Sequence, residues 1–200
     1  AILNFVVIPA TSYGAQLALG ALGVTLIYGI LRFSNFAHGD TMAFGTAIVI
    51  LLTWGLQAMG VSFGPLPTAL LALPVAIALT AVLVLLTDRW VYRHYRRIKA
   101  APIVVVMASV GVMFVMNGLT RLLIGVGEIQ FADGARFVVS VAEFKKWTGL
   151  AEGLSLRTTQ VITLVVAALA VWALFWFLNR TRSGKAMRAY ADNEDLALLS

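Results

Sequence analysis

The sequence predicts an all-α protein, a polytopic transmembrane helical bundle with about five spans. The chain of 200 residues is 60% hydrophobic and only 12% charged, whereas a soluble domain is roughly 25% charged. Its mean hydropathy is +0.91, and a soluble core of this size could not bury so much apolar surface. The apolar residues form continuous runs, not the alternating pattern of a membrane β-barrel.

Five apolar stretches are long enough, or nearly so, for the roughly 20 residues that a spanning helix needs. Backbone polar groups must be paired inside lipid, so each stretch is predicted to be a helix. In order, they cover about residues 5–31, 42–59, 66–86, 102–124 and 159–178.

The first stretch carries small residues at spacings of three and four, which places them on one helical face. Gly and Ala are common in membrane helices, but such a face also lets a second helix approach closely. We favour a packing face, with this helix at the centre of the bundle. The residues are Gly14, Ala18, Ala21, Thr25 and Gly29.

Between the first and second stretches lies the polar sequence NFAHGD, residues 35–40, with His38 and Asp40. A metal site needs three or four ligands, and the other histidine, His94, lies two spans away. The sequence has no H-E-x-x-H or G-x-S-x-G motif, so we expect neither a catalytic nor a metal site. Two interpretations stay open. The segment is either a helix-ending turn near the headgroups or a broken helix beside a transport path.

The loops orient the helices. Basic residues gather at residues 88–101 (DRWVYRHYRRIKAA) and 179–190 (NRTRSGKAMRAY), and the positive-inside rule places both on the cytoplasmic side. The segment at residues 125–157 has balanced charge and is expected outside as a short insertion. Within it we expect a small hairpin at 129–139 and a short surface helix at 141–150.

The formal net charge of +6 would favour nucleic-acid binding in a soluble protein. Here the basic residues lie in short loops beside apolar spans, which is the topology signal of a membrane protein. We therefore expect a lipid bilayer and no nucleic acid as partner.

Asn117 is an isolated polar residue in the fourth stretch. It is expected either to hydrogen-bond across helices, at about 1 kcal/mol, or to contact a substrate, and we favour the structural role. Arg121 lies one turn later and is expected to extend outward to the interface.

The polar tail, residues 181–200, follows the fifth stretch. Gly184 is expected to break the chain as it leaves the membrane, because Gly adopts positive φ at little cost. Residues 186–191 are predicted to be helical, and Asp192 or Asn193 can cap a second short helix. Such a tail either lies on anionic lipid or docks on a cytoplasmic partner.

Three passages, in this order, resemble the permeases of branched-chain amino-acid ABC importers, the high-affinity hydrophobic amino-acid uptake permease family. They are GVTLIYGILRFSNFAHGDTMAFGT at residues 23–46, VVVMASVGVMFVMNGLTRLLIG at 104–125 and RTRSGKAMRAYADNEDLALLS at 180–200. Phe33 and Ser34 depart from the pattern, since the family often has an aliphatic pair there.

The resemblance implies a multi-pass permease subunit in the bacterial inner membrane that imports leucine, isoleucine, valine or a similar amino acid. Its partners would be a second permease subunit, two ATP-binding subunits and a periplasmic substrate-binding protein. The chain has no Walker A sequence, so ATP hydrolysis is expected in the partners, and neither enzymatic activity nor a cofactor is expected here. The chain would be a single permease domain, residues 1–200, with further spans beyond Ser200.

Other readings stay open. Urea and short-chain amide permeases share much of the same pattern. A secondary transporter is less favoured, because it would need paired intramembrane charges for ion coupling, and a membrane scaffold or enzyme subunit is a further alternative.

The resemblance also implies roles for individual residues around the polar turn and in the tail, where a cytoplasmic coupling helix is expected. The expected residues of the translocation path or gate are Tyr28, Asn35, His38, Asp40 and Asn117. The expected ATPase-coupling residues are Arg182, Gly184, Met187, Arg188, Ala189, Asp192 and Asp195.

Overall fold

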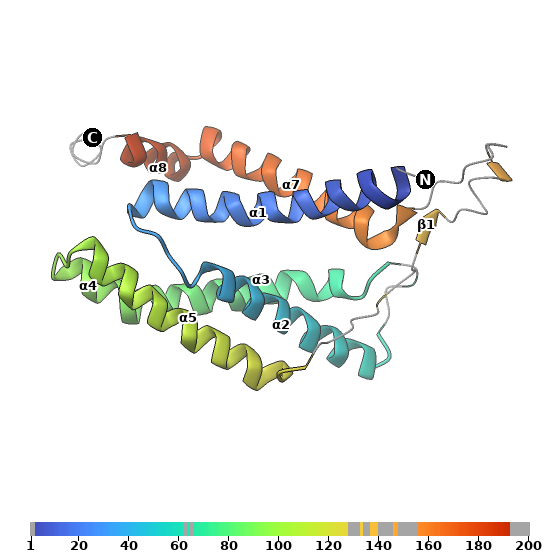
Figure 1. Ribbon diagram of the computed structural model, residues 1–200, viewed down its shortest axis with the longest axis horizontal. Coiled ribbons are helices and arrows are strands. Elements are labelled where there is room, and N and C mark those ends of the chain that lie inside the picture. The colour runs from blue at the N-terminus through green and yellow to red at the C-terminus, as the bar shows by residue number, and fades with distance from the viewer. Residues whose placement is uncertain are drawn as a thin grey trace. The chain divides into compact units, whose positions relative to one another are not determined.

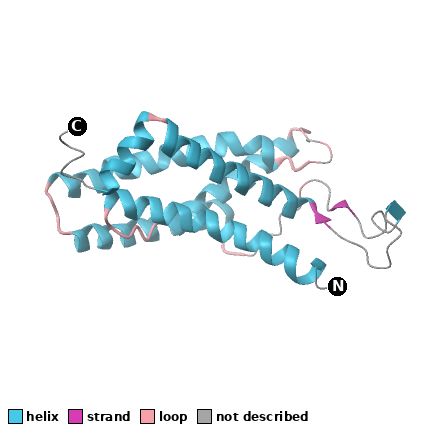
Figure 2. Ribbon diagram, turned by 90° about the horizontal axis from the view of Figure 1, so that it is seen from above, coloured by secondary structure: helices cyan, strands magenta, loops and turns pink. Residues whose placement is uncertain are grey.

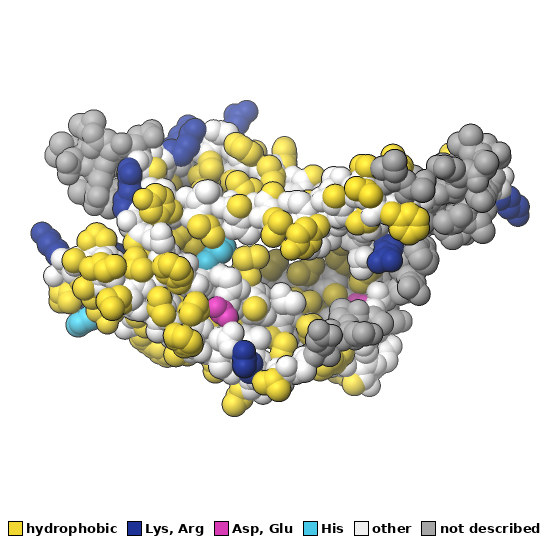
Figure 3. Space-filling view, in the orientation of Figure 1, with side chains coloured by type: hydrophobic (Ala, Val, Ile, Leu, Met, Phe, Trp, Pro, Cys, Tyr) yellow, Lys and Arg dark blue, Asp and Glu magenta, His cyan; other side chains and the backbone are white. Residues whose placement is uncertain are grey.

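The computed structural model describes residues 3–61, 64, 66–127, 133, 137–139, 146–147 and 156–192. Helices make up nearly all of this part of the chain (Figure 2). Hydrophobic side chains cover much of the face drawn in Figure 3, as expected for helices surrounded by lipid. Among the described residues, 5 helical segments are long and apolar enough to cross a membrane, which confirms the predicted fold class. They are Leu3–Leu31, His38–Ala58, Ala69–Arg97, Pro102–Ile124 and Thr158–Arg180.

The chain divides into two compact units. The turn unit is Arg32–Ala135, and the tail unit joins Ala1–Leu31 to Arg136–Ser200. In the turn unit, α2 lies against both α3 and α5 (Figure 1). Its helices are α2 (His38–Ala58), α3 (Ala69–Thr87), η2 (Asp88–Tyr92), α4 (Arg93–Arg97) and α5 (Pro102–Ile124).

Small residues bring α2 and α3 together. Ala47 on α2 and Ala72 and Ala76 on α3 are buried. A Cβ added at Gly45 would lie 3.2 Å from Thr80 Oγ1, so only a residue without a side chain fits there without displacing its neighbour. This is the small-residue packing that membrane helices use.

The third span is longer than predicted. Residues 88–101 are not a connecting loop, because the helix continues from α3 through the π-helical turn η2 and through α4 to Arg97. No Gly or Pro interrupts this stretch, and Asp88 bonds Arg96 through both carboxylate oxygens at 2.7 Å. Only residues 98–101 connect α4 to α5.

In the tail unit, α1 lies against α7, and α8 contacts both helices. The antiparallel strands β1 and β2 pair Phe137 with Arg157. Most of the predicted surface helix at 141–150 and most of the predicted hairpin at 129–139 lie outside the described residues. Lys146 and Trp147 of the predicted surface helix are described and are helical. The elements are η1 (Leu3–Val7), α1 (Ile8–Leu31), β1 (Phe137–Val139), β2 (Leu156–Arg157), α7 (Thr158–Arg180) and α8 (Arg182–Asp192).

All five predicted spans are confirmed, and the fourth has the predicted bounds. Pro102 occupies the first turn of α5, where its missing N–H costs nothing. Gly125 follows the last residue with a φ of 82° and a ψ of −173°, a backbone conformation that glycine adopts at little cost.

The small-residue face predicted on α1 is used only in part. Ala18 lines the apolar groove between α1 and α7. A Cβ added at Gly14 or Gly29 would meet no atom within 4 Å, and Ser12 is the one buried residue of α1. The expectation that this helix is central is therefore not confirmed by the described residues.

Candidate functional site

The polar segment after the first span is a helix break. Helix α1 ends at Leu31, and α2 begins at His38. Arg32 directly after α1 has a φ of 56°, a left-handed conformation that helix ends favour but that a residue with a Cβ rarely adopts. This confirms the helix end predicted within NFAHGD and its flanks. His38 and Asp40 belong to the first turn of α2 and not to the turn itself.

The turn at residues 32–37 contributes to the core of its unit. Phe33 and Ala37 are buried and belong to one cluster with Val105, Val112 and Met116 of α5. Phe33 also packs on Tyr92 of η2 with ring centroids 5.6 Å apart. The aromatic residue that departs from the family pattern is thus an anchor for the turn.

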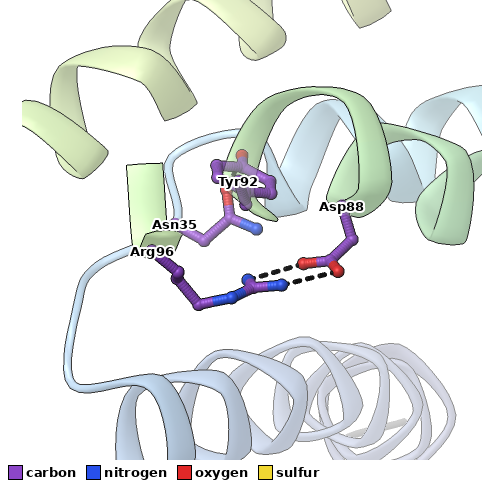
Figure 4. Close-up of polar contacts among 4 residues, drawn as sticks. All are labelled: Asn35, Asp88, Tyr92 and Arg96. Carbon is purple, nitrogen blue, oxygen red and sulfur yellow. Dashed lines mark hydrogen bonds and ion pairs between the residues drawn. The ribbon is translucent and has the colours of Figure 1, made fainter. Parts of the chain in front are cut away.

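Polar side chains from two other helices pair with the turn. Asn35 Oδ1 accepts a hydrogen bond from the Tyr92 hydroxyl and one from the Ala37 amide, both at 3.1 Å. Figure 4 shows Asn35 and Tyr92 side by side near the Asp88–Arg96 ion pair. The Phe36 amide donates to Ser109 Oγ at 3.1 Å. These bonds satisfy backbone and side-chain groups that lipid could not.

Asp40 is paired with the fourth span. Asn117 Nδ2 donates to Asp40 Oδ1 at 2.9 Å. At 1.5 Å per residue, Asn117 lies about 22 Å along α5 from Pro102, within a helix that can cross the hydrocarbon core of roughly 30 Å. Asp40 therefore bonds a neighbouring helix, and the predicted hydrogen bond of Asn117 across helices is confirmed.

Two other predicted path residues, His38 and Tyr28, take no part in these side-chain hydrogen bonds. His38 is half-buried, and its buried Nε2 atom has no hydrogen-bond partner among the described residues. Tyr28 lies on α1 in the tail unit with an exposed side chain. Within the described part of the chain, no group of three or more His, Cys, Asp or Glu could hold a metal ion.

The tail bends at Thr181, and the predicted break at Gly184 is wrong. Thr181 has extended backbone between α7 and α8. Its hydroxyl donates to Phe177 O at 2.7 Å and accepts from the Gly184 amide at 3.0 Å, which caps α8. Gly184 lies inside α8 and is not among the positive-φ residues of the described chain.

Gly184 has a different role from the predicted one. A Cβ at this position would lie 2.6 Å from Leu178 Cα and would also collide with the Phe177 carbonyl oxygen. Both atoms belong to the backbone of α7, so they cannot rotate away as a flexible side chain would. Gly184 is therefore required for the close approach of α8 to α7.

The remaining coupling residues lie on α8 or beyond it. Arg182, Met187 and Ala189 are exposed, and Arg188 Nη1 donates to Asn179 Oδ1 of α7 at 2.9 Å. Asp192 ends α8, whereas Asp195 and the second predicted helix lie outside the described residues.

The sequence predicted no role for three residues that make these contacts, namely Tyr92, Ser109 and Thr181. A signal existed for Thr181, because a Thr three residues before an amide at the start of a polar helix fits an N-cap. A single sequence offers no comparable signal for Tyr92, which lies 57 positions from its partner Asn35.

Comparisons with known proteins identify a family. Residues 7–200 match the sequence model of the family described as "Branched-chain amino acid transport system / permease component". The high-affinity branched-chain amino acid transport system permease protein LivH of Escherichia coli is 28% identical over 190 residues, which cover 93% of this chain and 58% of that protein. LivH of Salmonella typhimurium gives the same values.

The permease protein BraD of Pseudomonas aeruginosa is 26% identical over 180 residues, which cover 90% of this chain and 56% of that protein. The chain thus spans 56–58% of the length of these curated relatives. No solved structure matches it at a significant level. The family match and the five apolar helices together show that this chain is a multi-pass inner-membrane protein and belongs to the permease family of branched-chain amino-acid transport systems.

Proposed function

We propose that this chain is a membrane-spanning permease subunit of an ATP-driven importer for leucine, isoleucine, valine or a similar amino acid. The observation that carries the proposal is the family match across residues 7–200. The partners would be a second permease subunit, two ATP-binding subunits and a periplasmic substrate-binding protein. ATP hydrolysis belongs to the partners, since this chain has no Walker A sequence.

The turn at residues 32–37 and the Asp40–Asn117 pair form part of the translocation path or its gate. Irregular backbone is tolerated at membrane depth where it is buried in protein or lines a cavity. A carboxylate there is costly and is usually functional. His38 Nε2, which lacks a partner among the described residues, offers a further polar group to a substrate or to water.

Helix α8 couples the permease to an ATP-binding subunit. An ATPase movement must act on a rigid element, and α8 is fixed to α7 by the Thr181 cap, by the Arg188–Asn179 bond and by the contact at Gly184. Ala189 is exposed on this helix and is the position where a larger, charged side chain would disturb a docked partner. In the full-length subunit, Ala189→Glu should lower ATP hydrolysis stimulated by the binding protein without lowering membrane insertion. Hydrolysis and uptake at the parent rate would leave α8 as a membrane-surface helix only.

The orientation follows from the basic segments. The end of the third span with α4 and residues 98–101 is cytoplasmic, and the segment at residues 125–157 is periplasmic. Single cysteines at Arg96 and Lys146, both exposed, can be labelled with an impermeant thiol reagent in whole cells. Labelling at position 146 and not at 96 is expected, and the opposite pattern would reject the orientation.

Transport by the reconstituted importer tests the function. The full-length subunit and its partner subunits are placed in proteoliposomes, and uptake of labelled leucine is measured with ATP and with a catalytically inactive ATP-binding subunit. Leucine should accumulate only with active ATPase, and isoleucine and valine should compete, whereas urea and acetamide should not. Accumulation of urea in place of leucine would favour the amide-type alternative, and ATP-independent uptake would reject the importer.

A further inference from the structure

A basic pocket lies where the third span ends. Its lining passes from the last apolar turns of α3 into η2 and α4, and its open volume is about 580 Å³. Four arginines and one aspartate give the lining a formal net charge of +3. The lining residues are Leu85, Asp88, Arg89, Arg93, Arg96 and Arg97.

Arg96 and Asp88 form an ion pair, which leaves three arginines of the pocket. Arg96 Nη1 and Nη2 donate to the two oxygens of Asp88, both at 2.7 Å (Figure 4). This bidentate geometry fixes the Arg96 side chain on one side of the pocket. Arg89, Arg93 and Arg97 are exposed and make no ion pair with a described residue. Three guanidinium groups are therefore available to an anion.

The pocket lies at the depth of lipid headgroups. The 19 residues of α3 measure about 28 Å, close to the thickness of the hydrocarbon core. The same helix continues through η2 and α4, which therefore enter the headgroup layer. Leu85 in the last turn of α3 is 68% exposed, and Trp90 in η2 is 73% exposed. An exposed Trp at this level is typical of the membrane interface.

We propose that this pocket binds the headgroup phosphate of an anionic phospholipid in the cytoplasmic leaflet. Guanidinium groups match the geometry of phosphate oxygens, and anionic lipids attract basic segments beside a span. Leu85 in the pocket lining supplies an apolar contact for the acyl part of a lipid, which a free anion lacks, and Trp90 is exposed on the same helix. The inference rests on the proposed orientation and is independent of the transported substrate.

Lipid binding by purified protein tests this inference. The full-length subunit is prepared as Arg93→Gln/Arg97→Gln and as the matched control Arg121→Gln/Lys146→Gln, which removes two exposed charges elsewhere. Native mass spectrometry then measures bound phosphatidylglycerol and phosphatidylcholine. A basic residue near the surface contributes about fivefold to affinity, so the first pair should weaken phosphatidylglycerol binding by about tenfold or more. The control should change it less than twofold, and phosphatidylcholine binding should not change.

Three results would overturn the inference. Equal losses in both variants would show unspecific attraction of anionic lipid. Displacement of phosphatidylglycerol by millimolar inorganic phosphate would show a simple anion site. Unchanged phosphatidylglycerol binding with loss of the co-purifying ATP-binding subunit would assign the arginines to a protein interface. Leucine uptake is measured separately, so failure of the lipid site and failure of the transport proposal are distinguishable.

Discussion

The two units hold their helices together in different ways. In the turn unit, polar groups from distant parts of the sequence pair across helices, as in Asn35 with Tyr92 and Asp40 with Asn117. In the tail unit, α1 and α7 line a groove with small and aliphatic side chains such as Ala18 and Ala167. The side-chain hydrogen bonds that hold α8 to α7 stay close in sequence, and Arg188 with Asn179 spans nine positions.

The difference follows from backbone continuity. Between helices, lipid gives no hydrophobic driving force, so association depends on close packing or on hydrogen bonds. The turn at residues 32–37 leaves backbone amides that helical bonding cannot satisfy. Ser109 of α5 accepts from the Phe36 amide, and the Asn35 side chain, which Tyr92 of η2 also contacts, accepts from the Ala37 amide. Helices α1 and α7 have continuous backbones, so packing is sufficient for them. The polar contacts of Asn35 and Phe36 therefore lie at the place where a helix is broken.

Gly184→Ala should have the largest effect, because it tests close packing where backbone meets backbone. The new Cβ would collide with Phe177 O and lie 2.6 Å from Leu178 Cα. Overpacking costs about 1–3 kcal/mol and more when the neighbour cannot move. We expect a lower thermal unfolding midpoint in detergent and faster proteolysis between α7 and α8.

Gly14→Ala is the matched control for this prediction. A Cβ there meets no atom within 4 Å, and Ala favours a helix over Gly by about 1 kcal/mol. The thermal unfolding midpoint of Gly14→Ala should equal or exceed that of the parent. Equal behaviour of the two variants would mean that the contact at Gly184 is not required.

Asn117→Leu should have the next largest effect, because it leaves the Asp40 carboxylate without its donor. An unsatisfied buried polar group costs about 1–3 kcal/mol, and a charged one more. Thr120→Val on the same helix is the control, since the Thr120 hydroxyl bonds only Met116 O of its own helix in the described chain. The thermal unfolding midpoint in detergent should fall clearly for Asn117→Leu and only slightly for Thr120→Val. Similar losses would argue against the interhelical pair.

Ser109→Ala and Tyr92→Phe should have intermediate and graded effects. The first leaves the Phe36 amide without its acceptor, at about 1–3 kcal/mol. The second removes one of two donors to Asn35 Oδ1, at about 1 kcal/mol. The same unfolding measurement should therefore rank Ser109→Ala below Tyr92→Phe in stability. The reverse order would mean that Tyr92, and not α5, fixes the turn.

Asp133→Asn should have the smallest effect. Asp133 Oδ2 accepts from the Ala69 amide at 2.7 Å, and Oδ1 accepts from Gln57 Nε2 at 3.1 Å, so it caps α3 and ties it to α2. Asn keeps one acceptor oxygen for the Ala69 amide, and it loses the charge at the helix N-terminus, about 0.5 kcal/mol, and the second acceptor, which serves the exposed Gln57 side chain. Asp133→Ala should cost about 1 kcal/mol. No difference between the Asn and Ala variants in unfolding midpoint would reject the capping role.

Long apolar runs were enough to predict all five spans, and the Pro and Gly at the ends of α5 set its bounds. The continuation of the third helix through Asp88 to Arg97 was not predictable from charge alone, since the same arginines signal orientation whether they lie in a loop or a helix. Gly184 shows a second limit. A glycine indicated a special position, but the sequence alone does not distinguish a glycine needed for close approach from one needed for a positive φ. The partners of Asn35 and Asp40 lie 57 and 77 positions away, and only the fold brings them together.

We propose that Asp40 and Asn117, which share a hydrogen bond, form one functional pair at membrane depth, and exchanging the two residues tests this most directly. ATP-driven leucine uptake by the full importer is compared for the parent, Asp40→Asn, Asn117→Asp and the double exchange. Each single variant should lose uptake, Asn117→Asp most, because two adjacent carboxylates repel one another. The double exchange restores one carboxylate and one amide in contact and should recover most of the uptake. A double variant no more active than Asn117→Asp alone would contradict the claim.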